Sequence, residues 1–328
     1  MVIAVDAAGG DHFPEYPVQG ALEALGERSD LKILLVGPSG PIEDVLSEAS
    51  FDKSRISVLD APEVIGMNES PASAVKSKRH SSIVSGIGAH RNGECEAFVS
   101  AGNTGALLAA STLILGRLEN VQRPTIAATF PTLRGFRLLL DAGANLELKP
   151  ESYVQFARMA SIYAEEVMRI DDPKIGLLNV GEEPEKGTEL HKTAFNLLAS
   201  LPHFIGNVEG KDIFSAKADV YLCDGFSGNL ILKFGESIPA MIQDLLHGTF
   251  GEMKVDEKTR RAVLQLLGRA LDSFNYEHVG GVPFLGVNGV SMVGHGSSTP
   301  KAIKNMIFNA ARCVEMEINR KIVASLKS

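Results

Sequence analysis

The sequence contains no tryptophan and only three cysteines, Cys95, Cys223 and Cys313. The cysteines are widely spaced and form no CxxC pair, which argues against both a disulfide framework and a zinc site. We therefore expect three buried, reduced thiols in a cytosolic protein. Because tryptophan is absent, any ring that stacks against a ligand must belong to tyrosine, phenylalanine or histidine.

Long hydrophobic runs and an excess of basic residues are missing too. No apolar run is long enough to span a bilayer, which excludes an integral membrane protein but not attachment to a membrane surface. The formal net charge of −8 argues against a general nucleic-acid-binding protein. No basic segment precedes the apolar residues 2–5, which therefore predict a strand rather than a signal peptide. A Walker A motif and an opening GxGxxG are also absent, so a standard nucleotide-binding fold has no support.

Residues 100–106, Ser-Ala-Gly-Asn-Thr-Gly-Ala, lie between a strand pattern at 97–99 and a helical pattern at 107–115. A glycine-containing turn between a strand and a helix presents backbone N–H groups that can hold an anion. Gly102 and Gly105 allow close approach to the backbone, and Ser100, Asn103 and Thr104 add polar side chains. An ordinary helix cap would use the same residues. We favour a phosphate-binding turn because similar turns recur along the chain.

Polar residues and glycine follow one strand pattern after another. Predicted strands cover residues 2–5, 32–36, 56–59, 97–99, 125–130, 136–140, 175–178, 219–223 and 289–293, with helical patterns between most of them. This alternation predicts a three-layer α/β/α fold with a mostly parallel sheet. We expect one domain over residues 1–328. Two lobes that share a cleft are the alternative arrangement. The turns at the strand ends are expected to assemble one site.

Residues 237–276 interrupt the alternation and predict a pair of amphipathic helices that projects from the α/β fold. Apolar stripes run from Ile238 to Leu246 and from Val263 to Phe274. Such stripes usually pack on a core, but a projecting pair can instead meet a second subunit or a membrane surface. Leu245 and Phe250 are the residues that we expect to contact a membrane.

The densest basic cluster of this acidic chain consists of Lys76, Lys78, Arg79 and His80. A solvated helix face explains such a run. The alternative interpretation is docking of an acidic partner protein.

Seven short segments together resemble the bacterial phosphate acyltransferases of phospholipid synthesis. In order over residues 3–298 they are IAVDAAGGDH, SAGNTGALLAA, LLDAGAN with the following KPE, GLLNVGEE with KG, FIGNVEG, DGFSGN and GHGSS. Ala8 stands where methionine is expected, and residues 291–293 are less basic than expected; neither departure bears on the chemistry. The resemblance implies a fold like that of isocitrate and isopropylmalate dehydrogenases, and a homodimer.

The resemblance implies transfer of a long-chain fatty acyl group from acyl carrier protein to inorganic phosphate, which gives acyl phosphate for phospholipid synthesis. It implies no cofactor and no metal. Phosphate can displace a thiolate directly, so the protein has to hold phosphate, align it with the thioester carbon and stabilise the oxyanion. It also implies a cytoplasmic protein that associates peripherally with the inner face of the cell membrane. The membrane glycerol-3-phosphate acyltransferase that uses acyl phosphate is a further candidate partner.

The candidate catalytic residues are Asp224 and His295, either of which can take or orient a proton of phosphate, and Asn229, a neutral donor for the thioester carbonyl. Turn formation or helix capping would explain each of them singly. Acyl carrier protein is expected to dock on Lys76, Lys78 and Arg79. The candidate residues for binding substrate and phosphate are Asp6, Gly10, Asp11, Ser100, Gly102, Asn103, Thr104, Gly105, Asn145, Lys149, Asn179, Lys186, Asn207, Gly228 and Ser297.

Three other functions stay open at this point. A phosphotransacetylase would prefer a short acyl-coenzyme A to acyl carrier protein. An NAD-dependent dehydrogenase of the isocitrate type would need a metal-binding aspartate cluster together with a basic substrate clamp, which the sequence does not offer together. A lipid-phosphate-binding scaffold on the membrane would bind without turnover.

Overall fold

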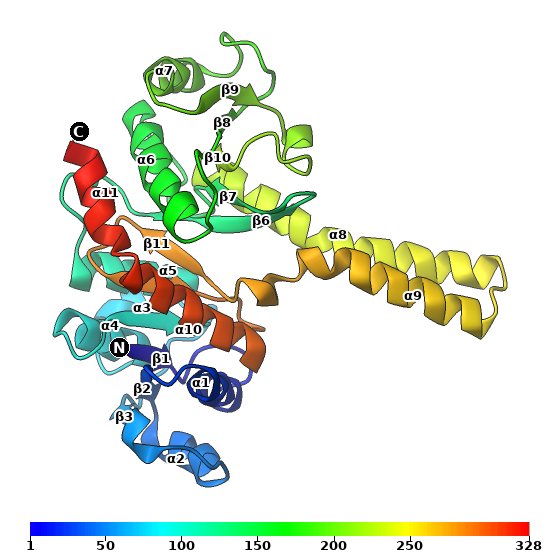
Figure 1. Cartoon of the computed structure of the whole chain (residues 1–328). Helices are drawn as coiled ribbons and strands as arrows, with labels where there is room; N and C mark the ends of the chain where they lie inside the picture. The colour runs from blue at the N-terminus through cyan, green and yellow to red at the C-terminus, as the bar shows by residue number, and fades with distance from the viewer. Residues whose placement is uncertain (328) are drawn as a thin grey trace. The chain divides into compact units, whose positions relative to one another are not determined.

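The computed structural model describes residues 1–327, which form two compact units (Figure 1). Unit 1 contains residues 1–127, 154–172 and the chain from 276 onward; unit 2 contains residues 128–153 and 173–275. Each unit has its own mostly parallel β-sheet. The expectation of one domain, or of two lobes that share a cleft, stays a prediction.

The sheet of unit 1 has seven strands in the order β3-β2-β1-β4-β12-β11-β5. Apolar, β-branched runs form its buried centre, where Ile3, Val5 and Phe98 are shielded from solvent. Only β11 runs antiparallel to its neighbours β12 and β5. The strands are β1 (Val2–Asp6), β2 (Lys32–Gly37), β3 (Ile56–Asp60), β4 (Ala97–Ser100), β5 (Thr125–Ile126), β11 (Val282–Leu285) and β12 (Val290–Val293).

Helices cover both faces of this sheet. The connection from β1 through α1 to β2 runs toward the β3 edge of the sheet, whereas the connection from β3 through α4 to β4 runs back across it. Because both crossovers between parallel strands are right-handed, these opposite directions place α1 and α4 on opposite faces of the sheet. Helix α10 packs against α1. The helices of unit 1 are α1 (Glu15–Glu27), α2 (Ser39–Ser47), α3 (Pro71–Ser77), α4 (Ser82–Arg91), α5 (Thr104–Ala110) with a π-helical continuation (Ser111–Leu115), α10 (Pro300–Glu315) and α11 (Ile318–Lys327). Helix α6 (Pro150–Glu166) begins in unit 2 and belongs to unit 1 from residue 154 onward.

The sheet of unit 2 has five strands in the order β6-β7-β10-β8-β9, with β6 antiparallel to β7. Its core includes Phe130, Leu139 and Tyr221. The strands are β6 (Ala128–Thr132), β7 (Gly135–Leu140), β8 (Ile175–Leu178), β9 (Phe204–Val208) and β10 (Val220–Leu222); the helices are α7 (Glu189–Leu198), α8 (Gly225–Glu252) and α9 (Glu257–Leu271). Short 3-10 helices cover residues 210–212 and 272–274 in this unit, and residues 53–55 and 276–278 in unit 1.

The predicted α/β fold is confirmed, and the largest error concerns the start of α8. This helix begins at Gly225 rather than at Ser237, so the polar residues 224–229 are its cap and first turns and not a loop. The glycines that suggested a loop allow the helix to approach the 141–145 segment. A Cβ on Gly228 would lie 1.8 Å from the Asp141 carbonyl oxygen. Helix α4 and strands β9 and β11 have no predicted counterpart, and the strand predicted at 125–130 is two short strands.

Helices α8 and α9 form the predicted amphipathic pair, and they contact each other near their connecting loop. Phe250 is buried there, with the Arg260 guanidinium 5.9 Å from its ring centre and the His247 ring set edge-on to it. The prediction of Phe250 as a membrane contact is therefore wrong, because its ring closes the end of the hairpin. Leu245 is 64% exposed. Within residues 1–327 no helix has the length and apolar content to cross a membrane.

Two glycines of α4 offer a matched test of the packing in unit 1. A Cβ on Gly86 would lie 2.0 Å from the Phe98 ring, whereas a Cβ on Gly88 would meet nothing within 4 Å. Gly86→Ala should lower the free energy of unfolding by about 1–3 kcal/mol through overpacking. Gly88→Ala should raise it by up to about 1 kcal/mol through helix propensity. Urea denaturation checks both, and equal transition midpoints for the two variants would contradict the packing described.

Candidate functional site

The order of strands in unit 1 reverses between β1 and β4, and in open α/β sheets ligands bind beyond the strand ends at such a point. The turns that follow β1, β4 and β12 meet there. The Asp11 N–H donates to the Gly296 carbonyl oxygen at 2.8 Å, and the Gly294 N–H donates to that of Ser100 at 2.9 Å. Eight predicted site residues therefore lie together in unit 1: Asp6, Gly10, Asp11, Ser100, Gly102, Asn103, His295 and Ser297.

The Asp6 carboxylate joins two of these turns. It is buried, its Oδ2 accepts a hydrogen bond from the Ser100 hydroxyl at 2.5 Å, and its Oδ1 accepts one from the Ala8 N–H at 3.0 Å. Burial raises the pKa of Asp6, and hydrogen bonds from Ser100, Ser82 and Ala8 oppose that rise. The Ser100 hydroxyl oxygen in turn accepts the Gly102 N–H at 2.9 Å. Asp6, Ser100 and the Gly102 N–H thus bind one another, which argues against their predicted contact with phosphate.

The side chain of Asn103 is also occupied by the protein. Its Oδ1 accepts the Ala106 N–H at 3.0 Å and so caps α5. Its Nδ2 donates to the carbonyl oxygens of Gly66, Met67 and Glu69 at 3.0, 3.2 and 3.3 Å. This use of both groups argues against the prediction that Asn103 binds phosphate.

The backbone N–H groups of Thr104 and Gly105 stay candidates for the predicted binding of an anion. Thr104 and Gly105 are the first two residues of α5, so their N–H groups have no partner within the helix, and both residues are only half-buried. The Thr104 hydroxyl adds a third donor at the same turn. Gly105 also lets α3 approach, since a Cβ there would lie 2.5 Å from Pro71 Cγ.

The His295 ring is exposed, and its Nδ1 interacts with Ser297. Nδ1 lies 2.7 Å from the Ser297 hydroxyl oxygen and accepts the Ser297 N–H at 3.2 Å. In the neutral ring this places the proton on Nε2. His295 is therefore better arranged to donate a hydrogen bond to a substrate oxygen than to accept its proton.

A second group of predicted residues lies in unit 2, around Asp141, which sequence reasoning missed. Asn145 donates to Asp141 Oδ2 through its N–H at 2.6 Å and through its Nδ2 at 2.8 Å. The Ala144 N–H donates to Oδ1 at 3.1 Å. The available signal was position, because Asp141 follows the apolar run of β7 as Asp6 ends that of β1. Lys149 is exposed directly before α6.

Asp224 is the N-cap of α8 and accepts hydrogen bonds from the Ser227 N–H at 2.8 Å and the Ser227 hydroxyl at 2.9 Å. Both carboxylate oxygens are therefore used in capping, which does not favour the predicted proton transfer. Gly228 packs on the Asp141 carbonyl oxygen. Asn229 is exposed beside Gly143, where a Cβ would lie 3.7 Å from its side chain.

A third group, also in unit 2, contains Asn179, Lys186 and Asn207. Asn179 Nδ2 donates to the Lys186 carbonyl oxygen at 3.1 Å and to Asn207 Oδ1 at 3.2 Å. Asn207 Nδ2 donates to the Glu183 carbonyl oxygen at 2.8 Å. The two amides thus hold the 180–187 loop, while the Lys186 side chain is exposed.

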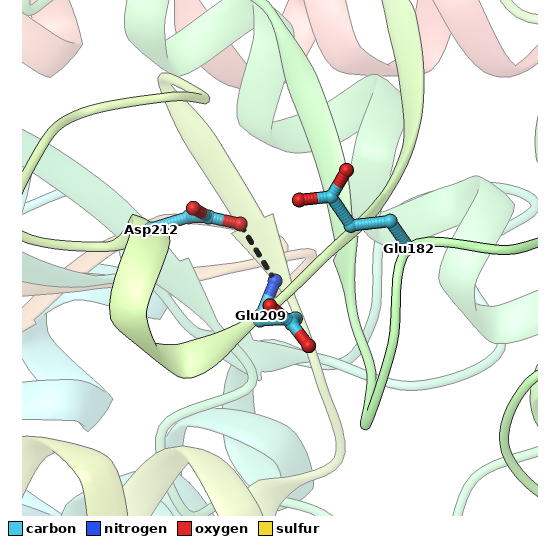
Figure 2. Close-up of side chains that lie close together, drawn as sticks. All are labelled: Glu182, Glu209 and Asp212. Atoms are coloured by element: carbon cyan, nitrogen blue, oxygen red, sulfur yellow. Dashed lines mark hydrogen bonds between the residues drawn. The ribbon is translucent and has the colours of Figure 1, made fainter.

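Three carboxylates of unit 2 have the spacing of a metal site. Figure 2 shows Glu182, Glu209 and Asp212, whose ligand atoms lie within 4.8 Å of one another. Lys217 Nζ lies 2.8 Å from Glu182 and 3.3 Å from Asp212, and Lys211 pairs with Glu209. Two ammonium groups thus already pair with these three carboxylates, so the geometry of the cluster gives no support for a metal ion.

The three cysteines are buried, and burial raises the pKa of each thiol. A thiol in such a setting does not ionise to a nucleophilic thiolate near neutral pH. This arrangement disfavours an acyl-cysteine intermediate.

The predicted docking residues divide into two groups. Lys78 Nζ lies 2.6 Å from Glu69 Oε1 and donates to the Val64 carbonyl oxygen at 2.7 Å, so it holds the adjacent loop. This pairing does not favour the predicted docking role of Lys78, which stays a prediction. Lys76 and Arg79 are exposed.

Comparison with known proteins covers nearly the whole chain. The model of a family described as "Fatty acid synthesis protein" matches residues 1–321. The phosphate acyltransferase of Chlorobaculum parvum is 47% identical over 337 residues, with 99% of this chain and 99% of the relative covered. That of Heliobacterium modesticaldum is 47% identical over 332 residues, covering 100% and 97%. Among solved structures, a phosphotransacetylase from Streptococcus pyogenes matches with a TM-score of 0.61 at 16% identity, covering 96% of this chain and 94% of that one.

The fold and its strand-end turns place the chain in the class of α/β proteins with the phosphotransacetylase fold. Within that class, the chain belongs to the phosphate acyltransferases of fatty acid and phospholipid synthesis. It is an acyltransferase, as the seven segments predicted. The dehydrogenase and scaffold alternatives are set aside by this membership.

The raised pKa of Asp6 predicts a pH dependence of stability. An aspartate whose folded pKa lies above its ordinary value of 3.8 contributes stability below that pH and loses it as pH rises through the folded pKa. Asp6→Asn is nearly isosteric and does not titrate. The free energy of unfolding of this variant, relative to the parent protein, should therefore increase as pH rises from 3.8 through the folded pKa. Urea denaturation across that range measures the difference, and parallel profiles would show that Asp6 has no raised pKa.

Proposed function

We propose that this acyltransferase moves a long-chain acyl group from acyl carrier protein to inorganic phosphate. The observation that carries the proposal is the convergence of the β1, β4 and β12 turns at the reversal of strand order in unit 1. Relatives named phosphate acyltransferases, similar over the whole chain, support phosphate as the acceptor. The proposal goes beyond these names in taking acyl carrier protein as the acyl donor.

In this proposal phosphate binds at the turn between β4 and α5. The donors are the N–H groups of Thr104 and Gly105, the Thr104 hydroxyl and His295 Nε2–H. A phosphate oxygen attacks the thioester carbon, the C–S bond breaks, and the carrier thiolate leaves. The proton carried by monohydrogen phosphate ends on that thiol, so the overall reaction needs no permanent proton acceptor on the protein.

Direct attack fits the buried, neutral state of all three cysteines. Catalysis then depends on alignment of phosphate with the thioester carbon and on donors already oriented toward the oxyanion. Asn229, exposed on the first turns of α8, stays a candidate for such a donor. Roles for Asn145, Lys149 and Lys186 remain predictions.

Turnover of palmitoyl-acyl carrier protein tests the proposal. The protein should form palmitoyl phosphate, trapped as the hydroxamate by hydroxylamine, only when inorganic phosphate is present. Palmitoyl-coenzyme A and acetyl-coenzyme A are the comparison donors. Strong preference for acetyl-coenzyme A would favour the phosphotransacetylase alternative, and lack of any phosphate-dependent product would overturn the proposal.

The exposed residues Lys76 and Arg79 are proposed to meet the acidic carrier. Lys76→Glu with Arg79→Glu should raise the KM for palmitoyl-acyl carrier protein about ten-fold at low ionic strength, but leave that for palmitoyl-coenzyme A unchanged. Lys53→Glu with Arg123→Glu makes the same change of charge at two other exposed positions and is the control. Equal effects of the two pairs would remove the docking surface.

The exposed stripe of α8 is proposed to attach the protein to the membrane surface. Its apolar side chains are 54–70% exposed; they are Phe226, Leu230, Phe234, Met241 and Leu245. Apolar contact of this size gives reversible attachment and hence a cytoplasmic and a membrane-bound pool. A homodimer that covers the stripe is the competing interpretation.

Flotation with phosphatidylglycerol vesicles distinguishes the two interpretations of the stripe. Leu245→Glu should reduce the floating fraction several-fold, because it places a charge on the apolar face. Gln243→Glu changes an exposed polar residue of the same helix and should float like the parent protein. Unchanged flotation of Leu245→Glu, with dissociation of a dimer on gel filtration, would assign the stripe to a subunit interface.

A further inference from the structure

The loop at residues 64–69, which we call the shelf, lacks regular secondary structure for most of its length but is held by two sets of side-chain contacts. The first set comes from the phosphate turn. Asn103 Nδ2 donates to three of its carbonyl oxygens, those of Gly66, Met67 and Glu69. The residue that caps α5 therefore also fixes the shelf to the β4 turn.

The second set comes from an ion pair. Glu69 Oε1 accepts the Gly66 N–H at 2.6 Å and lies 2.6 Å from Lys78 Nζ, which also donates to the Val64 carbonyl oxygen at 2.7 Å. The Lys78 ammonium holds the pKa of the Glu69 carboxyl below its usual value, so this carboxyl is ionised at neutral pH. The shelf is thus fixed at its beginning, middle and end.

These contacts present one large apolar side chain to solvent. Met67 is 52% exposed. Its Cε lies 3.4 Å from the position of a Cβ on Gly296, and Asp11 Oδ1 lies at the same distance from that position. Met67 therefore lies beside the β12 turn that carries His295 and Ser297.

An exposed methionine contributes little to folding, and ordering its backbone costs conformational entropy. Methionine is unbranched and polarisable, and it adapts to flexible apolar ligands. Attack on a thioester requires the phosphate oxygen about 3–3.5 Å from the carbonyl carbon. Phosphate held at the adjacent turn therefore places the start of the acyl chain near the shelf.

We propose that Met67, fixed on this shelf, binds the acyl chain of the thioester and contributes to preference for long chains. The inference rests on the proposed acyl transfer to phosphate. It assigns Asn103 and Lys78 to positioning the shelf rather than to binding phosphate or the carrier.

Kinetics with donors of two chain lengths test this role. Met67→Gln keeps the length of the side chain but removes its apolar end, and should raise the KM for palmitoyl-acyl carrier protein about five-fold. The KM for butyryl-acyl carrier protein and the KM for phosphate should not change. Met67→Leu, which stays apolar, is the matched control and should resemble the parent protein. An equal effect on both chain lengths, or an effect on phosphate alone, would overturn the proposal.

A binding measurement separates this inference from the proposed reaction. The chain has no tryptophan, so Met67→Trp introduces a single tryptophan, whose emission can be excited separately from that of the tyrosines. Its emission should shift to the blue on addition of palmitoyl-coenzyme A, but not on addition of acetyl-coenzyme A or phosphate. Leu113→Trp, at a position of unit 1 that is 62% exposed, should show no shift. A shift without turnover would support the acyl site and reject the reaction, whereas turnover without a shift would reject the acyl site.

Discussion

The buried Asp6 carboxylate is the contact on which the arrangement of unit 1 depends. A buried carboxylate without partners would cost several kcal/mol, so its hydrogen bonds to Ser100 and Ala8 constrain both turns. Ser100 extends the constraint to Gly102, and the β12 turn joins through Gly294. These contacts fix the turn between β4 and α5. Hydrogen-bond donors on a fixed turn need no reorganisation when charge develops on a substrate oxygen, which is the condition for electrostatic catalysis.

The sequence predicted that the residues after β1, β4 and β12 lie together, but it predicted neither the separate groups in unit 2 nor what each residue does. Asp6, Ser100 and His295 could be placed at one edge because parallel strands direct their carboxyl ends the same way. Their roles depend on partners distant in the chain, such as the carbonyl oxygens that Asn103 contacts 34–37 residues away. Glycine patterns misled at α8, because Gly225 and Gly228 serve close packing there rather than a turn. Phe250 is expected from the sequence to contact a membrane, yet Arg260 and His247 cover its ring.

The polar network and the proposed chemistry divide the turn residues into two sets. Side chains that hold the protein together, such as Asn103, Asp141 and Asp224, have their polar atoms hydrogen-bonded to other groups of the protein. Thr104 and Gly105 begin helix α5, so their N–H groups have no partner within the helix, and we propose that phosphate binds there. Removal of a residue of the first set should therefore loosen the fold, whereas removal of one of the second set should weaken phosphate binding.

The central claim is that inorganic phosphate binds at the edge where the β1, β4 and β12 turns meet. A crystal structure with arsenate tests it most directly, because arsenate mimics phosphate and arsenic can be located by its anomalous scattering. The account predicts an arsenic site within hydrogen-bonding reach of the Thr104 and Gly105 N–H groups. Arsenate at the 180–187 loop or at the start of α8, with the β4 turn empty, would contradict it.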